Sequence, residues 1–282
     1  MAGFFGLFDY TKEGPGVEKN ERKKKGFFSF FEIYFRNFWQ FVKVDFIYCL
    51  ISLPLVTNGM AKAGLTHISR SVTREKHSFG LSDFFETVKK NWKQSLILGI
   101  LNVVFTALLL FGLWFYWNSL NASFSAFNVI GLGVVLFLLI CTTFMKYYIW
   151  TMVITFSLTI KQIIKNSFHF VFLNFWRNIL ISVTMGIIYA LLAAIIMLTP
   201  GNGFCLLLSA AIFIFAVPGF KANLVQSNTF PVIKKYMIDP YYAEHKGEDI
   251  EKRKSLGLDV PEDEIGADKS EDESIFSDER IQ

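Results

Sequence analysis

The chain is dominated by long apolar segments that contain no charged residue. Asp, Glu, Lys and Arg are absent from Gln94 to Met145, and again from Asn178 to Phe220. A helix that crosses a bilayer needs about 20 consecutive apolar residues. Each run is therefore long enough for two crossings joined by a short turn, and neither shows the polar face of a soluble surface helix. The pattern predicts an integral membrane protein.

The apolar pattern predicts an all-α fold, a polytopic membrane helix bundle with five strong spans. These spans cover approximately residues 27–53, 95–117, 127–150, 178–198 and 204–224. The second and third are joined by a neutral turn at 118–125, and the fourth and fifth by another at 199–203. A short returning helix over 60–74 is also expected, which makes five or six crossings.

The returning helix follows from the distribution of Lys and Arg. Basic loops stay in the cytoplasm, so the basic N-terminal region and the basic connection 76–93 both belong inside. The chain must therefore turn back after the first apolar stretch, and Pro54 and Gly59 mark the expected hairpin bend. About 15 helical residues span only some 22 Å. Residues 60–74 are thus either a short sixth crossing or half of a re-entrant hairpin surrounded by protein.

Tryptophans at three helix entrances support this orientation. Trp39, Trp92 and Trp176 each stand at the cytoplasmic entrance of an expected helix, where the headgroup region favours indole rings. The two neutral turns then face outside, and both termini are expected in the cytoplasm of a bacterial cell.

Charge divides the chain into three regions. Residues 1–26 form a polar and basic N-terminus, residues 27–243 the membrane domain, and residues 244–282 an acidic tail that is expected to be disordered. Residues 1–243 hold 22 Lys and Arg against 10 Asp and Glu, and the tail holds 6 against 14. The positive charge belongs to loops that flank the lipid bilayer, so it does not indicate nucleic-acid binding.

Asp45 is the most informative single residue in the apolar segments. It lies about 9 Å deeper along a helix than Trp39, and an acid at that depth needs a partner or a wet cavity. In a hairpin centred between Pro54 and Gly59, the matching level on the return is flanked by His67 and Arg70. We therefore expect an intramembrane polar cluster of Asp45, His67 and Arg70, which either locks the hairpin or serves a substrate or proton. The alternative is that Asp45 pairs with Lys43 or reaches the membrane surface by snorkelling.

Catalytic and cofactor motifs are absent from the sequence. It contains no G-x-S-x-G, H-E-x-x-H, phosphate-binding loop or C-x-x-C pattern. The three cysteines are widely spaced within apolar segments, which argues against a disulfide framework or a zinc site. No enzymatic activity, metal or cofactor is expected.

Five motifs stand out in the sequence: Gly6-Leu-Phe-Asp-Tyr, Gly14-Pro-Gly-Val, Phe31-Glu-Ile-Tyr-Phe-Arg-Asn-Phe-Trp39, Leu53-Pro-Leu-Val-Thr57 and Ser82-Asp-Phe-Phe-Glu-Thr-Val-Lys-Lys-Asn-Trp-Lys-Gln94. Together they resemble the YesL family of uncharacterised bacterial membrane proteins. The resemblance covers roughly residues 3–240 and is most specific in the N-terminal third. In this sequence Met60 follows Gly59, where family members have Gly-Pro after the Thr of the bend, so a less rigid bend is expected.

The resemblance implies a functional neighbourhood rather than an activity, because genes of this family often lie beside genes for sugar uptake and polysaccharide use. The leading expectation is a protein that assists carbohydrate uptake, as a transporter accessory or a permease-like subunit. The alternative is a non-transporting regulator or scaffold that binds a transporter or a sensor kinase through its cytoplasmic loops.

Overall fold

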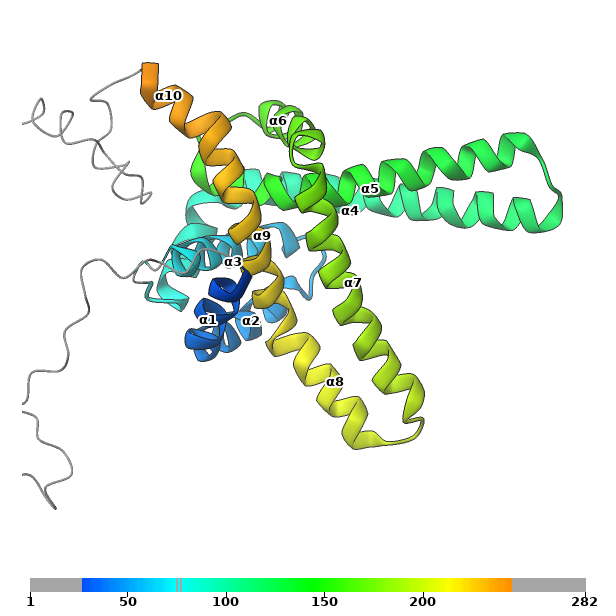
Figure 1. Ribbon diagram of the computed structural model, residues 1–282, viewed down its shortest axis with the longest axis horizontal. Helices are drawn as coiled ribbons and strands as arrows, with labels where there is room; N and C mark the ends of the chain where they lie inside the picture. The colour runs from blue at the N-terminus through cyan, green and yellow to red at the C-terminus, as the bar shows by residue number, and fades with distance from the viewer. Residues whose placement is uncertain (1–26, 75, 77, 245–282) are drawn as a thin grey trace, which may run out of the picture.

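The protein is helical throughout the part that the structure describes. The computed structural model describes residues 27–74, 76 and 78–244, and these residues form helices joined by short connections, with no strand among them (Figure 1). In chain order the elements are α1 (Phe27–Arg36), α2 (Phe38–Ser52), α3 (Asn58–Thr73), α4 (Leu81–Ala122), α5 (Ala126–Thr155), α6 (Ile160–Leu173), α7 (Phe175–Leu198), α8 (Gly203–Phe215), α9 (Val217–Ile233), the π-helical segment η2 (Lys234–Ile238) and α10 (Asp239–Glu244).

Four helices are long and apolar enough to cross a membrane. They are Leu81–Ala122, Ala126–Thr155, Phe175–Leu198 and the continuous stretch Gly203–Tyr242. Together with the absence of strands in the described ranges, they confirm the predicted all-α membrane helix bundle. Most of their apolar side chains are exposed, as expected for surfaces that contact lipid.

These helices form two hairpins that project from a common base. The first joins α4 to α5 and the second joins α7 to α8, and the two diverge toward their turns (Figure 1). The second turn lies where the neutral segment 199–203 predicted it, whereas the first is shorter than the predicted 118–125, because α4 continues to Ala122 and only residues 123–125 are non-helical. Another difference concerns α4, which begins in the polar connection at Leu81 and runs without interruption into the span. Gly80, with φ of 62°, precedes its first residue and ends the loop before it.

The helices of the first apolar hairpin are shorter than the hydrocarbon core of a bilayer is thick. Asn37 interrupts the stretch 27–53 and separates α1 from α2. Helix α2 has 15 residues and α3 has 16, so each is about 22–24 Å long, against about 30 Å for the hydrocarbon core. They form the expected helical hairpin, and neither is among the four long apolar helices.

The bend of this hairpin lies at residues 53–57, and it contains Pro54 but not Gly59. Gly59 belongs to the first turn of α3, where it is buried against α4. A Cβ atom at Gly59 would overlap the carbonyl oxygen of Ser95 and lie 2.7 Å from the Cα of Gly99. The expectation of a bend glycine is therefore corrected: Gly59 permits contact between two helix backbones, as small residues do in membrane bundles.

Helix α3 is the centre of the base. It packs against α2, α4, α5 and α9, and its Ala61, Ala63 and Ile68 have no exposed surface. Its small side chains let four helices approach closely. Protein therefore surrounds a helix whose composition is too polar for contact with lipid.

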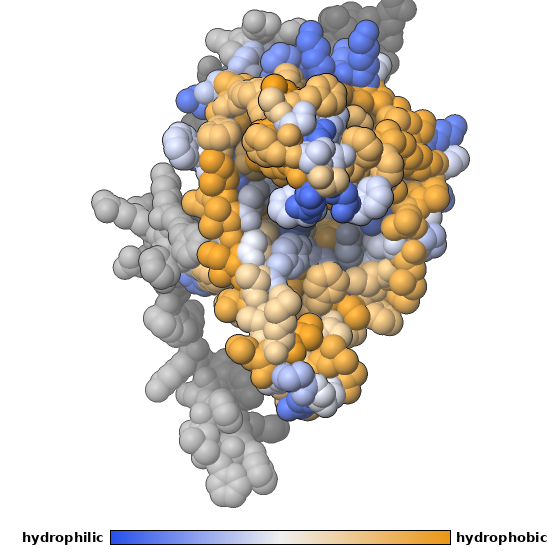
Figure 2. Space-filling model, turned by 90° about the vertical axis from the view of Figure 1, so that its right-hand side faces the viewer, coloured by the Kyte–Doolittle hydropathy of each residue, from blue (hydrophilic) through white to orange (hydrophobic). Residues whose placement is uncertain are grey.

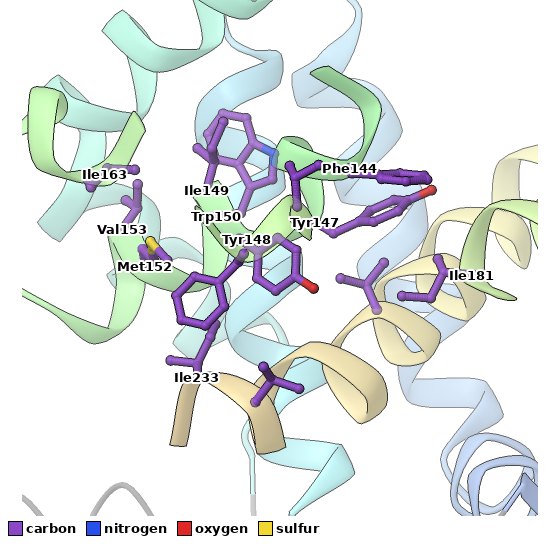
Figure 3. Packing of buried hydrophobic residues seen from close by; sticks show 14 of the residues in the cluster. Phe144, Tyr147, Tyr148, Ile149, Trp150, Met152, Val153, Ile163, Ile181 and Ile233 are labelled. Carbon is purple, nitrogen blue, oxygen red and sulfur yellow. The ribbon is translucent and has the colours of Figure 1, made fainter. Parts of the chain in front are cut away.

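The largest core cluster lies where the end of α5 meets α6, α7 and α9. Figure 3 shows Tyr147, Tyr148, Met152 and their neighbours packed between these helices. The ring of Tyr148 is fully buried and stacks on Phe170 at 5.2 Å between centroids, a contact worth about 0.5–1.5 kcal/mol beyond its area burial. This cluster anchors the second hairpin to the first.

The three predicted anchor tryptophans are all exposed. Trp39 and Trp176 lie in the first turns of α2 and α7, and Trp92 lies in the polar start of α4. The predicted N-terminal region 1–26 and all of the predicted tail 244–282 except Glu244 lie outside the described residues.

Candidate functional site

Asp45 lies at the contact between α2 and the last long helix. Its side chain has no exposed surface, and its Oδ2 accepts a hydrogen bond from the backbone N–H of Gly219 at 2.9 Å. Its Oδ1 has no hydrogen-bond partner among the described residues. The partner of this buried carboxylate is thus a backbone group 174 residues away in the chain.

The helix is broken at the point where Asp45 contacts it. Ala216, with φ of −130°, separates α8 from α9, and Pro218 follows in the first turn of α9. Because proline has no N–H, the carbonyl of Ile214 loses its partner within the helix. The Sγ of Cys49 donates to that carbonyl at 3.5 Å, and the hydroxyl of Tyr34 donates to the carbonyl of Ala216 at 3.0 Å. Cys49 therefore satisfies the carbonyl that Pro218 leaves without a donor. The Ala216 carbonyl, which also accepts from the backbone N–H of Phe220, gains a second donor from Tyr34.

Glycine is needed at position 219 for α2 to pack this closely against the start of α9. A Cβ atom there would lie 2.8 Å from Cδ1 of Phe41 and 2.9 Å from Oδ2 of Asp45. The amino terminus of α9 carries a partial positive charge, which favours a carboxylate. The arrangement resembles the broken helices of membrane transporters, where non-helical backbone is tolerated inside protein. Oδ1 is chemically available to a proton or a cation.

His67 and Arg70 form a separate contact on α3. The guanidinium of Arg70 donates to Oγ1 of Thr155 at 2.7 Å and to Nδ1 of His67 at 3.3 Å. Asp45 does not take part, because it faces α9 while Arg70 faces the end of α5. The structure thus brings two of the three predicted residues together and corrects the predicted pairing with Asp45. Asp45 and Arg70 thus point toward different helices, a matter of helix rotation that the hairpin estimate did not include.

The electrostatics of this contact keep His67 neutral. Burial and the neighbouring charge of Arg70 lower the pKa of His67 to about 4, from 6.5. The neutral imidazole accepts the hydrogen bond from Arg70 at Nδ1 and carries its proton on Nε2. Arg70 is itself nearly buried, so this acceptor and Thr155 compensate for most of the hydration that its charge loses.

A layer of small polar side chains joins α3, α5 and α9, and the sequence reasoning missed it. Thr73 donates to Oδ1 of Asn223 at 2.7 Å, and Nε2 of Gln226 donates to Oγ1 of Thr151 at 2.7 Å. Asn223, Gln226 and Thr151 are essentially unexposed. The available signal was the helical spacing of polar residues within apolar segments, such as Asn223 with Gln226. Nowhere in the described ranges do three or more His, Cys, Asp or Glu side chains form a group that could hold a metal ion.

Comparison with known proteins gives one match. The model of a family described as "Protein of unknown function, DUF624" matches residues 41–113. This segment spans most of α2, all of α3 and the first three quarters of α4, and it includes Asp45, His67 and Arg70. Neither the curated proteins nor the solved structures contain a match. The matched segment therefore contains most of the α2–α3 hairpin and most of α4.

Proposed function

We propose that this protein is an accessory subunit of a membrane transport assembly that takes up carbohydrate. The observation that carries the proposal is the separation of the two apolar hairpins. Each projects from the base with its outer faces exposed, as at Leu108, Phe111, Leu191 and Leu207 (Figure 1). Several polar groups at the base, among them Asp45, Asn223 and Thr151, are instead buried between packed helices. Such surfaces suit contact with lipid and with the helices of a partner.

The carbohydrate component rests on the resemblance to the YesL family. Its motifs at Leu53–Thr57 and Ser82–Gln94 fall within the segment 41–113 that matches the uncharacterised family, whereas the earlier motifs do not. Genes of the resembled family often neighbour genes for sugar uptake. The proposal assigns no catalytic step to this chain, and it takes both termini as cytoplasmic in a bacterial cell membrane because the basic loops favour that orientation.

The proposal is tested by capture of the assembly and by uptake. The full-length chain carrying a purification tag is isolated from its own cells in mild detergent, and the proteins that co-elute are identified. In parallel, uptake of labelled sugars is compared in cells with and without the gene. We expect a transporter to co-elute and uptake of at least one sugar to fall several-fold. Unchanged uptake of every sugar, with no transporter co-eluting, contradicts the proposal.

A second candidate is a non-transporting regulator or scaffold of a transporter or a sensor kinase. The observation that favours it is the basic surface at the start of α4, where Lys89, Lys90 and Lys93 are all exposed. Replacing the three by Glu should abolish co-elution of the partner while the purified protein keeps its thermal stability. A matched control is the double replacement of Lys161 and Lys165 by Glu on the exposed face of α6. If both variants retain the partner, this second candidate is wrong.

A further inference from the structure

Helix α6 joins the inner ends of the two membrane hairpins. Residues 156–159 connect it to α5, and Asn174 alone separates it from α7. Figure 1 places it at the base, away from both hairpin turns. Both hairpins project from this base, so α5 ends and α7 begins at the same membrane face. The 14 residues of α6, about 21 Å long, therefore connect two crossings without being a crossing themselves.

Both ends of α6 lie close to tryptophans of the kind that favour the headgroup region. Before its start, the carbonyl of Leu158 accepts a hydrogen bond at 2.6 Å from Nε2 of Gln94, which follows the exposed Trp92 by two residues. After its end comes Trp176, which is 80% exposed. In Figure 2, hydrophobic residues cover both hairpins and hydrophilic ones gather along the upper edge, where α6 and α10 lie in Figure 1. A helix with both ends at this level runs along the membrane surface.

One side of α6 is held against the protein. Ile163, Ser167 and Phe170 are buried. The Oγ of Ser167 donates to Sδ of Met152 at 3.6 Å, and the ring of Phe170 stacks on that of Tyr148. These contacts with α5 fix the rotation of α6 about its own axis, so they determine which of its side chains point away from the protein.

The outward side of α6 carries an apolar stripe beside a basic one. The apolar stripe consists of Ile164, Phe168 and Phe172, which recur at every fourth position and are 38%, 46% and 54% exposed. The basic stripe consists of Lys161 and Lys165, which are four positions apart and also exposed. Positions three residues apart differ by about 60° around a helix, so Lys165 lies beside Phe168. An exposed apolar stripe flanked by lysines is typical of helices that lie in a membrane interface.

We propose that α6 lies in the headgroup layer of the membrane and binds anionic phospholipid there. Its apolar stripe enters the boundary between headgroups and acyl chains, and its two lysines bind lipid phosphates. The bilayer is the partner because α5 and α7, which flank α6, both cross it. In the part of the chain that the structure describes, neither Lys161 nor Lys165 has a hydrogen bond or an ion pair, so both charges are open to lipid. This role goes beyond the proposed transport function and holds whatever assembly the chain joins.

The first test locates the apolar stripe relative to the bilayer. Full-length Phe168→Cys protein carries a nitroxide label and is reconstituted in nanodiscs of phosphatidylcholine and phosphatidylglycerol in equal parts. Collisions of the label with oxygen, which dissolves in the acyl region, and with a water-soluble nickel complex are measured. Leu191→Cys on α7 is the lipid-facing control, and Glu86→Cys, exposed near the start of α4, is the water-facing control. Wild-type protein treated in the same way gives the background from the natural cysteines.

We expect oxygen to reach the label of Phe168→Cys and the nickel complex to be excluded from it, as for Leu191→Cys. A label that the nickel complex reaches as readily as in Glu86→Cys overturns the proposal, because the stripe then faces water. A label that neither reagent reaches also overturns it, because protein rather than lipid then covers α6.

The second test measures the preference for anionic lipid. Phosphatidylglycerol is titrated into the full-length protein in neutral detergent, with phosphatidylcholine as the reference, and thermal stability is followed because a ligand of the folded state raises it. The double variant Lys161→Gln/Lys165→Gln removes both charges, and the matched control Lys161→Arg/Lys165→Arg keeps them. Each lysine near an anionic surface strengthens binding about fivefold, so the Gln variant should require at least about tenfold more phosphatidylglycerol than the wild type. The Arg variant should respond like the wild type.

Three results of this titration overturn the proposal. They are a Gln variant that responds like the wild type, an Arg variant that responds like the Gln variant, and a wild type that phosphatidylglycerol stabilises no more than phosphatidylcholine does. Both lysines are exposed, so neither double variant should prevent folding.

Discussion

The base around α3 and the two projecting hairpins are stabilised by different kinds of contact. Around α3, small residues let helices approach until backbones touch, and buried polar groups find partners on other helices. In the outer parts of the hairpins, large apolar residues face outward, and each helix packs mainly against its neighbour in the same hairpin. The base is therefore specified by close fit and hydrogen bonding, whereas the hairpins are specified by length and apolar composition. Substitutions should consequently have large effects in the base and small effects on the hairpin surfaces.

The largest effect is expected for Gly59→Ala. The added methyl group must displace the backbone of α4 at Ser95 and Gly99, so we expect a loss of about 3 kcal/mol in the free energy of unfolding. Thermal unfolding in detergent measures it. Gly186→Ala on α7 is the matched control, because a Cβ atom there meets nothing within 4 Å. Equal stability of the two variants would show that the base is not closely fitted.

Asp45→Ala should have the next largest effect. It removes the acceptor of the Gly219 N–H at the helix break, and an orphaned buried donor costs about 2 kcal/mol. Asp45→Asn keeps an acceptor oxygen of similar shape, so it should insert and remain close to the wild type in stability. If the carboxylate also serves a proton or substrate, uptake should fail in Asp45→Asn although the protein is intact. Wild-type uptake in Asp45→Asn would leave Asp45 with a structural role alone.

A pH effect of intermediate size is expected from His67. Its pKa is about 4 in the folded protein and near 6.5 when unfolded, so between these values only the unfolded chain binds the proton. Stability should therefore fall as the pH is lowered from 7 to 5, by about 2 kcal/mol from this residue. Comparing the pH dependence of unfolding in the wild type and His67→Gln isolates the contribution. Identical profiles would contradict the neutral, buried imidazole.

The smallest effect is expected on the hairpin surface. Leu207 on α8 is 71% exposed, so Leu207→Ala should change the free energy of unfolding in detergent by less than about 0.5 kcal/mol. Co-elution of partner proteins is also compared between Leu207→Ala and the wild type, each isolated from its own cells. A loss of partner co-elution without loss of stability would identify the α8 surface as a contact with another protein rather than with lipid alone.

Sequence reasoning predicted the hairpins well and the base poorly, for a physical reason. The hairpins depend on local properties, since an unbroken apolar run and a neutral turn such as 199–203 are sufficient to define them. The Gly59–Gly99 contact depends on how two helices rotate against each other, which neither local pattern displays.

The candidate site was predicted in the same partial way. Asp45 stood out because an acid in an apolar helix needs a partner. That partner is the backbone N–H of Gly219, in the first turn of α9 after the break at Ala216, and the break lies inside a charge-free run that was interpreted as one uninterrupted span. The polar layer of Asn223 and Gln226 escaped notice because amides carry no charge to interrupt the apolar pattern.

The bond between Asp45 and Gly219 also constrains how the protein is made. Synthesis proceeds from the amino terminus, so α2 leaves the ribosome 174 residues before the group that its carboxylate requires. Through that interval the carboxylate is held by water at the membrane surface or by another protein, because an unpaired acid is not stable within the bilayer. Helix α2 can therefore take up its final position only after α9 has been synthesised. A ribosome-bound chain that ends before Pro218 should leave α2 accessible from the cytoplasm, and one that extends past α9 should not.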